Sequence, residues 1–589
     1  MIESLLTTIG ELKGTPTTWP VVGLARDVLV TPWSNERRSL AHVFLKDCLT
    51  HHATCSYRES LLPTRVIDVG SATQDPHLHI SNGETGRYVT LSHCWGGSSP
   101  TTTTTDTIGS RTMGIQLSTL PKTFQDAVFI TRDLGVRYLW IDSLCIVQDS
   151  GEDWEREAAR MSEVYANGYV MLAADGSENC HGGCFPQTAG LTQGSFSIAV
   201  EGPCGRNSKV YCRLTNVLTD DRGEVCHRLY DPQSGFRRNV LDTRGWTLQE
   251  RILAPRIIHF GKSEIGWECA GKRACECQSV PTQTDLDSRF RAQLVDFQPR
   301  STDQTDSSAS DVENRLLWSN IVEEFTHRIL TETKDRLPAL SGLAKLMSLR
   351  TGMEYVCGMW KEKLSGFLMW QPDYDYVRSN SLSGVPNRVK EYYAPSWSWA
   401  SVTGPVQYKE LSKKSPFGGW REAYPINKGE SDWDEKNMNG LLKVLEVQSM
   451  QAGLNPFGPP QSTTLKVHGY VASARFHSRV KDLPQQSSSN GGLLLSTDTS
   501  SSAQADFEPD VLDAYEEVSI EDEVQLLFMV EIRPTGDGIS RYASGRGLVL
   551  VAATKGGGSY RRVGTFRFQG AERWEKWREL RNECTIQLI

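Results

Sequence analysis

The chain of 589 residues has no excess of basic residues, no long apolar run and no leader-like start. Its 71 Asp and Glu against 63 Lys and Arg give a formal net charge of −8, which provides no broad positive field for duplex nucleic acid. No stretch approaches the roughly 18 consecutive apolar residues that a membrane-spanning helix needs. The first residues, MIESLLTTIG, lack the basic segment and apolar run of a secretory signal. The composition therefore predicts a cytoplasmic protein with no membrane span and no nucleic acid as its main partner.

The sequence also has no GxxxxGK[ST] loop, and its cysteines show no regular metal-binding spacing. Without that loop, a nucleoside triphosphatase of the corresponding type is excluded. Several of the 14 cysteines stand inside apolar runs, where a reduced thiol serves as a small hydrophobic group. Zinc sites usually draw four N or S ligands from two close pairs, and the clusters at 180–184 and 269–277 are irregular. These cysteines are predicted to have structural or incidental roles, and no metal site is predicted.

What the chain does have is a series of apolar, strand-like runs that end at polar residues. Residues 88–91 form a first run, which stops at Ser92 and His93. A second run, 136–141, ends at Asp142. Ligands of open α/β sheets bind in the crevice at the carboxyl ends of the strands, so we expect these polar side chains to face one crevice.

Helix-like segments alternate with these runs. One begins at Leu120-Pro121 and ends before Gly135, and another, 152–167, repeats apolar residues at helical spacing. A third apolar run follows at 169–174. The alternation from about residue 87 to residue 271 predicts an α/β module with right-handed β-α-β connections.

The rest of the chain begins after a polar stretch. Residues 298–312 contain few apolar residues and predict a linker, which places a boundary near residue 300. Residues 313–349 are predicted to be helical, and 357–370 to supply aromatic core side chains. Beyond about residue 385, turn-rich segments predict a β-rich or mixed tail. The residues expected on the buried face of the first helical segment are Trp318, Val322, Phe325 and Ile329.

Three sequence blocks together resemble the fungal heterokaryon incompatibility (HET) domain. They are YVTLSHCWGG at 88–97, LPKTFQDAVFITRDLGVRYLWIDSLCIVQDSGEDWEREAARMSEVYANG at 120–168, and RGWTLQERILAPRIIHFG at 244–261. Farther on, DRLPALSGLA, CGMW and APSWSWASVTG, between residues 335 and 404, resemble the segment that often follows this domain. The expected organisation is an N-terminal preamble (1–84), a HET domain (85–275), a helical, aromatic-rich HET-associated region (276–405) and a mixed, partly disordered C-terminal region (406–589).

The resemblance implies a role in fungal non-self recognition, in which fusion of incompatible cells leads to programmed cell death. HET domains have been likened to the Toll/interleukin-1 receptor (TIR) fold, which implies a mostly parallel sheet flanked by helices. Some TIR proteins hydrolyse NAD, so the resemblance suggests NAD as a substrate, with no bound cofactor. The expected partner is an incompatibility protein or a second copy of the chain.

Cleavage of the N-glycosidic bond of NAD requires a carboxylate that stabilises positive charge on the ribose. Glu250 and Asp142 are the candidate catalytic carboxylates. Glu250 is favoured because TIR-like NAD hydrolases use a glutamate on a helix. Glu157 and Glu163 are rivals by the same reasoning.

Substrate binding requires donors for hydroxyl and phosphate groups and an aromatic surface for a base. Ser92 and His93 are candidates for the ribose, Arg244 for a phosphate and Trp95 for stacking on a ring.

Each of these residues also has a structural interpretation. Asp142 would cap the turn before Leu144, Ser92 would satisfy a backbone amide, and Arg244 would pair with Glu250. His93 would pack beneath Trp95 as a buried histidine. The same polar surface would also serve a non-enzymatic module that docks a partner.

Overall fold

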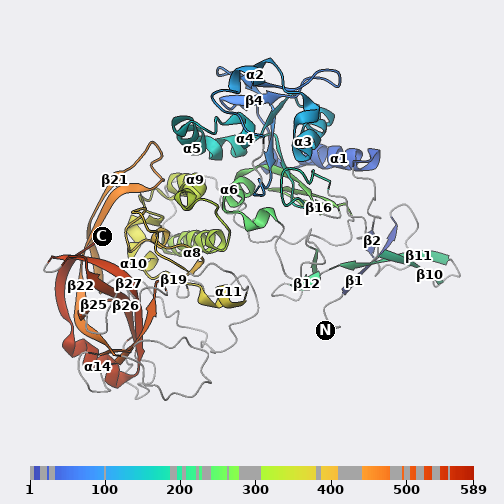
Figure 1. Cartoon of the computed structure of the whole chain (residues 1–589). Coiled ribbons are helices and arrows are strands. Elements are labelled where there is room, and N and C mark those ends of the chain that lie inside the picture. Colours follow the sequence, from blue (N-terminus) through green and yellow to red (C-terminus); the bar gives the residue numbers. More distant parts are fainter. Residues whose placement is uncertain are drawn as a thin grey trace. The chain divides into compact units, whose positions relative to one another are not determined.

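The computed structural model of the chain (Figure 1) divides into two compact units, residues 1–299 and residues 300–589. The division coincides with the polar stretch in which the sequence places a boundary. The structure describes residues 6–12, 23–25, 33–97, 101–185, 195–201, 207–215, 217–219, 225–227, 240–261, 264–276, 307–379, 386–408, 441–477, 494–496, 504–511, 523–532, 544–554 and 557–589.

The first unit is built around an eight-stranded mixed sheet. Its strands are β4 (Arg65–Asp68), β5 (His77–Ile80), β7 (Tyr88–Ser92), β8 (Tyr138–Trp140), β9 (Val170–Ala173), β14 (Arg256–Phe260), β15 (Ile265–Cys269) and β16 (Arg273–Cys275). Their order across the sheet is β16-β15-β14-β9-β7-β8-β4-β5. The central strands β14, β9, β7 and β8 run parallel, and the pairs outside them are antiparallel.

The expectation of a mostly parallel sheet is therefore met only at its centre. The outer strands β15 and β16 follow β14 through short connections, and β4 and β5 are also joined directly. Short connections can join only antiparallel neighbours, whereas parallel neighbours need a longer crossover. Strands β4 and β5 also show that the sheet includes residues that precede residue 85.

The helices of this unit confirm the expected alternation of strands and helices. They are α1 (Asn35–His51), α2 (Ile108–Met113), α3 (Lys122–Asp133), α4 (Asp142–Cys145), α5 (Gly151–Asn167) and α6 (Gly245–Leu253). Helix α3 begins directly after Pro121, buries Phe124 and Val128, and is followed by Gly135 at φ +68°. The side chain of Ser150 caps α5 by accepting from the backbone N–H of Asp153.

The order of the parallel strands creates a switch point between β7 and β9. From β7 the chain passes through α3 to β8 on one side, and then through α5 to β9 on the other side of β7. Since β-α-β connections are right-handed, a reversal of direction places the connecting helices on opposite faces and opens a crevice at the carboxyl ends of the two strands. Ser92 ends β7, and Asp175 lies just beyond β9.

The described residues of the first unit also form three smaller sheets. Strands β1 (Leu6–Leu12), β2 (Gly23–Ala25), β10 (Ser195–Glu201) and β11 (Asn207–Thr215) form one, in the order β10-β11-β1-β2. Strands β12 (Val217–Thr219) and β13 (Val225–His227) form a hairpin, and β3 (Ser60–Leu61) pairs with β6 (Thr85–Gly86).

The described part of the second unit begins with helices packed around buried aromatic side chains. The helices are α8 (Ser307–Thr326), α9 (Ser341–Thr351), α10 (Leu364–Phe367) and α11 (Tyr374–Ser379). The predicted helical segment 313–349 is thus interrupted between α8 and α9, where Pro338 lacks the N–H that a continuous helix needs. Trp318 is buried as expected, whereas Ile329 is 63% exposed because α8 ends before it. Among the described residues of this unit, the fully buried tryptophans are Trp318, Trp360, Trp370, Trp397, Trp399 and Trp577.

In the described residues from 441 to 589, the tail of the second unit contains an eight-stranded sheet and one helix. Its strands are β21 (Leu442–Gln451), β22 (Pro460–His477), β23 (Leu494–Ser496), β24 (Gln504–Pro509), β25 (Glu523–Ile532), β26 (Ser544–Ala552), β27 (Ser559–Gln569) and β28 (Asn582–Leu588). The pairings run β21-β22-β23-β24-β27-β26-β25, and β25 returns to pair with β22, so the sheet closes on itself. Helix α14 (Ala571–Leu580) contributes Trp577 to a core that also contains Phe528, Phe566 and Phe568. None of the described helices is both long enough and apolar enough to cross a membrane.

Candidate functional site at the end of strand β7

Strand β7 ends at a buried hydrogen bond between two of the residues that the sequence singles out. Ser92 Oγ donates to Glu250 Oε2 at 2.5 Å. Both residues are buried, and Glu250 is only 6% exposed. Glu250 lies on α6, far from Ser92 in the chain, and the fold brings them together. The backbone-amide role considered for Ser92 is replaced by this side-chain contact.

The carboxyl group of Glu250 has an unusually high proton affinity. Burial raises the pKa of Glu250 to about 7 from its ordinary 4.5, because the charged form loses its hydration. Hydrogen bonding from Ser92 lowers this pKa, and the negative charge of Asp142 raises it. The charge of Arg244 and a hydrogen bond with Tyr165 lower it further, but burial remains the largest effect. Both forms of the carboxyl group are therefore populated near neutral pH.

Tyr165 is a member of this site that sequence reasoning missed. Its hydroxyl group, on the buried face of α5, donates to the backbone oxygen of Leu91 at 3.2 Å and contacts Glu250. Burial, together with the charges of Glu250 and Asp142, raises the pKa of Tyr165 well above its ordinary value. The tyrosine therefore stays neutral. The helical spacing of Tyr165 in the sequence shows only that its side chain faces the core. Because a buried tyrosine hydroxyl group usually has a hydrogen-bond partner, the residue type is the one sequence signal that a polar group lies nearby.

Asp142 lies at the start of α4 and binds two donors. Its Oδ2 accepts from Trp95 Nε1 at 2.9 Å, and its Oδ1 accepts from the backbone N–H of Ser143 at 2.7 Å. The second bond matches the capping role considered for Asp142. The carboxylate is 24% exposed, so this acid, unlike Glu250, reaches solvent.

His93 is held as a neutral, packed side chain. Its Nδ1 lies 3.9 Å from Asp142 Oδ1, and its ring meets the ring of Phe124 edge-on, with the centroids 5.0 Å apart. Burial lowers the pKa of His93, against the charge of Asp142. Its Nε2 has no hydrogen-bond partner in the described part of the chain. The packing partner is thus Phe124, where the sequence suggested Trp95.

The turn after Trp95 packs tightly against the loop that follows β9. Gly96 has φ +71°, and a Cβ atom there would lie 2.2 Å from the Cβ of Asn179. Only glycine fits both the conformation and the space. The loops that follow β7 and β9 therefore meet at the switch point of the sheet.

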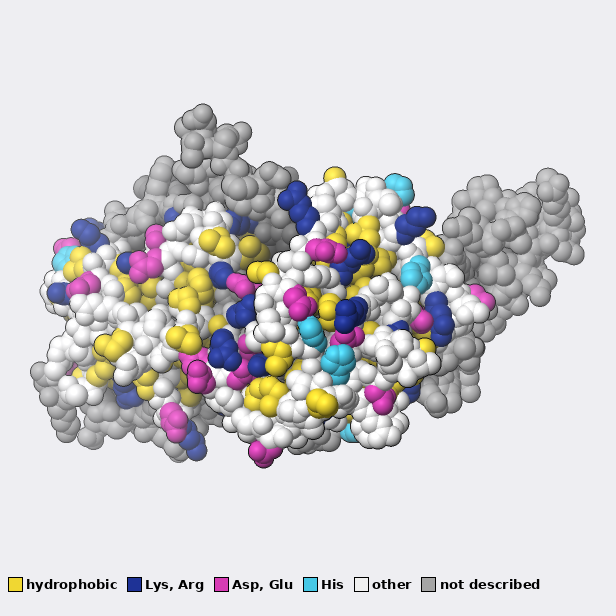
Figure 2. All heavy atoms as spheres, turned by 90° about the horizontal axis from the view of Figure 1, so that it is seen from above, with side chains coloured by type: hydrophobic (Ala, Val, Ile, Leu, Met, Phe, Trp, Pro, Cys, Tyr) yellow, Lys and Arg dark blue, Asp and Glu magenta, His cyan; other side chains and the backbone are white. Residues whose placement is uncertain are grey.

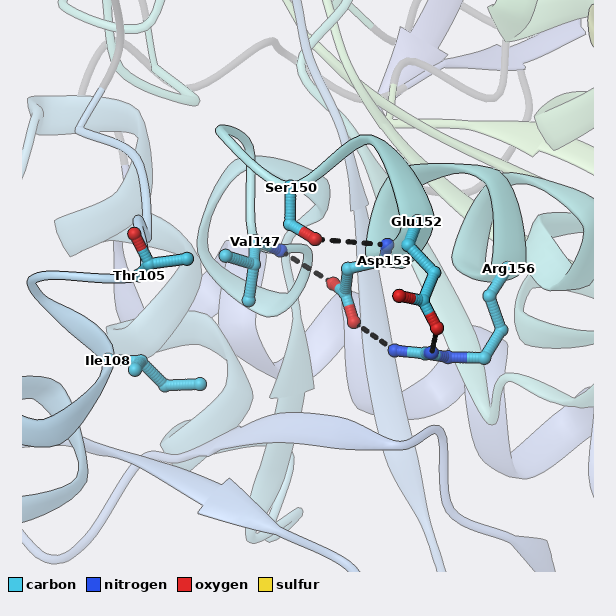
Figure 3. Close-up of a pocket in the computed structure, with 7 residues that line it drawn as sticks. All are labelled: Thr105, Ile108, Val147, Ser150, Glu152, Asp153 and Arg156. Atoms are coloured by element: carbon cyan, nitrogen blue, oxygen red, sulfur yellow. Dashed lines mark hydrogen bonds and ion pairs between the residues drawn. The ribbon is translucent and has the colours of Figure 1, made fainter.

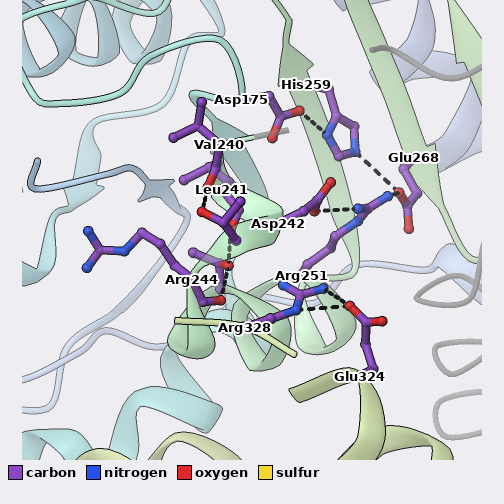
Figure 4. Close-up of polar contacts among 12 residues, drawn as sticks. Asp175, Val240, Leu241, Asp242, Arg244, Arg251, His259, Glu268, Glu324 and Arg328 are labelled. Atoms are coloured by element: carbon purple, nitrogen blue, oxygen red, sulfur yellow. Dashed lines mark hydrogen bonds and ion pairs between the residues drawn. The ribbon is translucent and has the colours of Figure 1, made fainter. Parts of the chain in front are cut away.

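Arg244 precedes α6 and is half-buried. Its charge acts on Glu250, and its guanidinium contacts the thiol of Cys94. Burial nevertheless raises the pKa of Cys94 to about 11, so this cysteine stays a thiol. In Figure 4 the guanidinium of Arg244 points away from the neighbouring charge network.

That network centres on His259 in β14 (Figure 4). His259 Nδ1 lies 2.7 Å from Asp175 Oδ2, and its Nε2 lies 3.2 Å from Glu268 Oε2. Glu268 also accepts from Arg251 at 3.0 Å and from Arg273 at 2.7 Å. Burial lowers the pKa of His259, but its two carboxylate neighbours outweigh burial and the pKa is raised. Each charge here faces an opposite charge, which is typical of a structural network.

The two rival glutamates lie elsewhere. Glu157 is buried beside Arg65 and Arg156, at 3.9 Å and 3.5 Å, and Glu163 is exposed on α5. A pocket of about 270 Å³ lies near the start of α5, and it is lined by Thr105, Ile108, Val147, Ser150, Glu152, Asp153 and Arg156 (Figure 3). Its Asp153 is bonded to Arg156 and to the backbone N–H of Val147. This pocket includes none of the predicted site residues.

The surface agrees with the modest net charge. On the face shown in Figure 2, acidic and basic side chains are interspersed among apolar and neutral ones. The described surface of that face therefore has the mixed character that the composition predicts.

Fold and site together define an α/β protein with a buried acid at the switch point of a mixed sheet. The family model described as heterokaryon incompatibility protein (HET) matches residues 88–250, a range that runs from the start of β7 to Glu250 itself. The protein is therefore a HET domain-containing protein, as its sequence blocks indicated. No curated protein matches the chain, and no solved structure does.

Proposed function

We propose that this protein is an effector of heterokaryon incompatibility that hydrolyses the nicotinamide–ribose bond of NAD, with Glu250 as the catalytic carboxylate. The HET domain indicates the role in incompatibility. The observation that supports an enzymatic function is the buried Glu250 carboxyl group, whose pKa of about 7 is matched to chemistry at neutral pH. It lies at the switch point of the sheet, where α/β proteins bind ligands.

Glu250 would act in its ionised form. As the nicotinamide–ribose bond breaks, the bonding electrons leave with nicotinamide, and positive charge develops on the ribose. A buried carboxylate stabilises that charge more strongly than an exposed one, because little water screens it. Water then adds to the ribose carbon and loses a proton, so the products are nicotinamide, ADP-ribose and a proton.

The residues around Glu250 would position the substrate. Ser92 and Tyr165 orient the carboxylate through their hydroxyl groups. Asp142 and Trp95 are partly exposed and joined by a hydrogen bond, which fixes the indole as a surface for a ring. Arg244 supplies a positive charge for a phosphate group.

The alternative is a non-enzymatic module that docks an incompatibility partner or a second copy of the chain. The low exposure of Glu250 favours this alternative, because a substrate must open the site to reach the carboxylate. In that case Trp95, Asp142 and Arg244 would form the docking surface and Glu250 would only hold it in place.

The two functions are separated by assaying NAD turnover and cell killing with the same variants. The full chain, concentrated or forced to oligomerise, is incubated with NAD, and nicotinamide release is measured by chromatography. Glu250→Gln and Asp142→Asn should each lose at least about a hundredfold in rate, if they remove charge stabilisation of the transition state. Glu163→Gln, an exposed change on α5, serves as the matched control and should keep full activity.

Expression in fungal cells completes the test. If Glu250→Gln abolishes both turnover and cell death, the enzyme is supported. Cell death that persists in a folded variant without turnover would instead establish the docking module, and an absence of turnover in the parent protein would overturn the enzymatic proposal.

A further inference from the structure

Four potential metal ligands converge at the carboxyl end of α1, away from Glu250. The Sγ atoms of Cys48, Cys55 and Cys269 and a ring nitrogen of His52 all lie within 4.8 Å of one another. His52 Nδ1 lies 3.3 Å from Cys269 Sγ. Among the described residues this is the one group of three or more Cys, His, Asp or Glu with such a geometry.

Three of these ligands come from one compact turn. Cys48 lies in the last turn of α1, His52 follows the helix, and Cys55 ends the short 3-10 helix after it. The backbone N–H of His52 donates to Cys48 O at 3.2 Å, and that of Cys55 donates to His52 O at 3.0 Å. These bonds hold the three side chains on one side of the turn.

The fourth ligand, Cys269, is the last residue of β15 and precedes the turn to β16. The backbone N–H of Cys269 donates to Lys272 O at 3.0 Å, which shapes this turn. Gly271 lies against the His52 ring, where a Cβ atom would be 2.9 Å from Cγ. Its backbone N–H also donates to the Cys55 thiol. Peptide N–H groups aimed at sulfur are the outer contacts that metal-bound thiolates commonly receive.

Other contacts fix α1 against the β15–β16 hairpin along its whole length. Arg37, at the first turn of α1, forms a buried ion pair with Glu276 at 2.9 Å. In the middle of the helix, the rings of Phe44 and Trp267 are 6.0 Å apart. The four ligands therefore lie on elements whose mutual position is set independently of them.

We propose that Cys48, His52, Cys55 and Cys269 bind one zinc ion as a structural Cys₃His site. Zinc bonds of about 2.3 Å to sulfur and about 2.0 Å to nitrogen place tetrahedral ligand atoms roughly 3.5–3.8 Å apart, so contraction by about 1 Å at most completes the site. Three thiolates with one imidazole select zinc over the hard ions that prefer oxygen. Four protein ligands leave no open position for a substrate, so the ion would stabilise the fold.

The location of this site gives it a specific structural consequence. Residues 48–55 precede the segment that matches the HET family, and Cys269 follows it. One zinc ion would therefore join the two flanking segments and fix α1 to the edge of the large sheet. The irregular spacing within 269–277 concealed the site, because its other ligands lie more than 200 residues earlier in the chain.

A disulfide is the competing chemistry for this group. All ten described cysteines are unpaired, and three neighbouring thiols cannot all be consumed by one disulfide. A disulfide would also leave His52 and one thiol without a role. The zinc site, in contrast, uses all four groups.

The test is zinc content per chain of the full-length protein, purified without chelator and measured by elemental mass spectrometry. The parent should contain one equivalent of zinc, and Cys269→Ser should contain little or none. Cys275→Ser is the matched control, because Cys275 is buried in the same hairpin and is not a member of the group. It should keep the full equivalent.

A second variant keeps the test decisive if Cys269→Ser fails to fold. His52→Cys should retain one equivalent, and its cobalt-substituted form should show stronger thiolate-to-metal absorption than that of the parent. The proposal is overturned if the parent binds no zinc after reconstitution, if Cys269→Ser binds as much as the parent, or if mass spectrometry finds the thiols in a disulfide.

Discussion

Each unit buries an ionisable side chain, Glu250 in the first unit and Arg562 in the second, but the groups that surround the two side chains differ. In the second unit, Arg562 is fully buried and bonds Asp510 through two nitrogens, at 3.0 and 2.8 Å. Its remaining donors reach the backbone oxygens of Leu368, at 2.5 Å, and Trp370, at 2.6 Å. The guanidinium also lies 3.8 Å from the centroid of the Trp370 ring. The Arg562 guanidinium therefore has a carboxylate, two backbone oxygens and an aromatic ring as partners.

Glu250 in the first unit has no such complement. Its hydrogen-bond partners are the neutral hydroxyl groups of Ser92 and Tyr165, and the nearby charges of Asp142 and Arg244 act on it in opposite directions. The consequence is a carboxyl group with a pKa near 7, whereas Arg562 is held as one half of an ion pair. A buried charge with a full set of opposite partners is typical of structure, and one with an incomplete set is typical of a functional site.

The largest effect on stability is expected when Arg562, the buried charge with a full set of partners, is replaced. Arg562→Met should destabilise the second unit by roughly 3–5 kcal/mol, because the buried Asp510 loses its two-nitrogen partner and keeps only the more distant Arg388, at 3.4 Å. Thermal unfolding followed by circular dichroism measures the loss. Arg567→Met, on the same strand, is the matched control: Arg567 and Asp506 are about half exposed and 3.7 Å apart, so the loss should stay below about 1 kcal/mol. Equal losses in the two variants would break the contrast.

Replacing Glu250, the buried charge without a full set of opposite partners, should raise folding stability, whereas replacing Arg562 should lower it. The folded protein keeps a proton on Glu250 that the unfolded chain releases as pH rises from about 4.5 to about 7, so folding stability falls across this window. Glu250→Gln removes this loss and should raise stability at pH 8 by on the order of 3 kcal/mol, with little change at pH 4. Denaturant unfolding at the two pH values measures the difference. A variant that is destabilised at pH 8 would show that the charge is matched after all.

The pH dependence of the proposed NAD hydrolysis tests the same carboxyl group. Because the proposal requires the ionised form of Glu250, it predicts a rate that falls about tenfold per pH unit below the pKa of about 7 and levels off above it. Initial rates of nicotinamide release from pH 5 to pH 9 give the profile. A midpoint of the rate profile near pH 4.5 would mean that the carboxylate that takes part in the reaction is not a buried one.

The smallest effect concerns the hydroxyl group that supports the carboxylate. Ser92→Ala removes the hydrogen bond that favours the ionised form of Glu250, so the midpoint of the rate profile should move upward by about one pH unit. Ser143→Ala, a buried serine at the neighbouring strand end, is the control and should leave the midpoint in place. An unchanged midpoint in Ser92→Ala would remove this serine from the site.

The parts of the fold that depend on local patterns could be predicted from the sequence. The apolar run at 88–91 and its polar end became β7 and Ser92, and the apolar periodicity of 152–167 became α5. These features depend only on the local sequence. The spacing of apolar residues along a strand or helix shows which side chains face the core, regardless of the residues they pack against. The mixed character of the sheet could not be predicted in the same way, because the pairing of β4 with β8 joins segments about 70 residues apart.

The candidate site also has features that the local sequence predicts and features that only the tertiary structure shows. The sequence indicated that Ser92 and Asp142 stand at strand ends and that Glu250 lies on a helix, but not that Ser92 would bond Glu250, that Tyr165 would join them, or that His93 would pack against Phe124. Nor did it indicate that Cys269 would meet Cys48, His52 and Cys55.

The sequence by itself determined which residues are apolar, where strongly patterned elements such as β7 and α5 lie, and which family the domain belongs to. Only the tertiary structure decided which polar groups share a buried environment, because that depends on strand order and helix packing. The pKa of Glu250 is the clearest case: its residue type sets the ordinary value, and removal from water by distant parts of the chain sets the actual one.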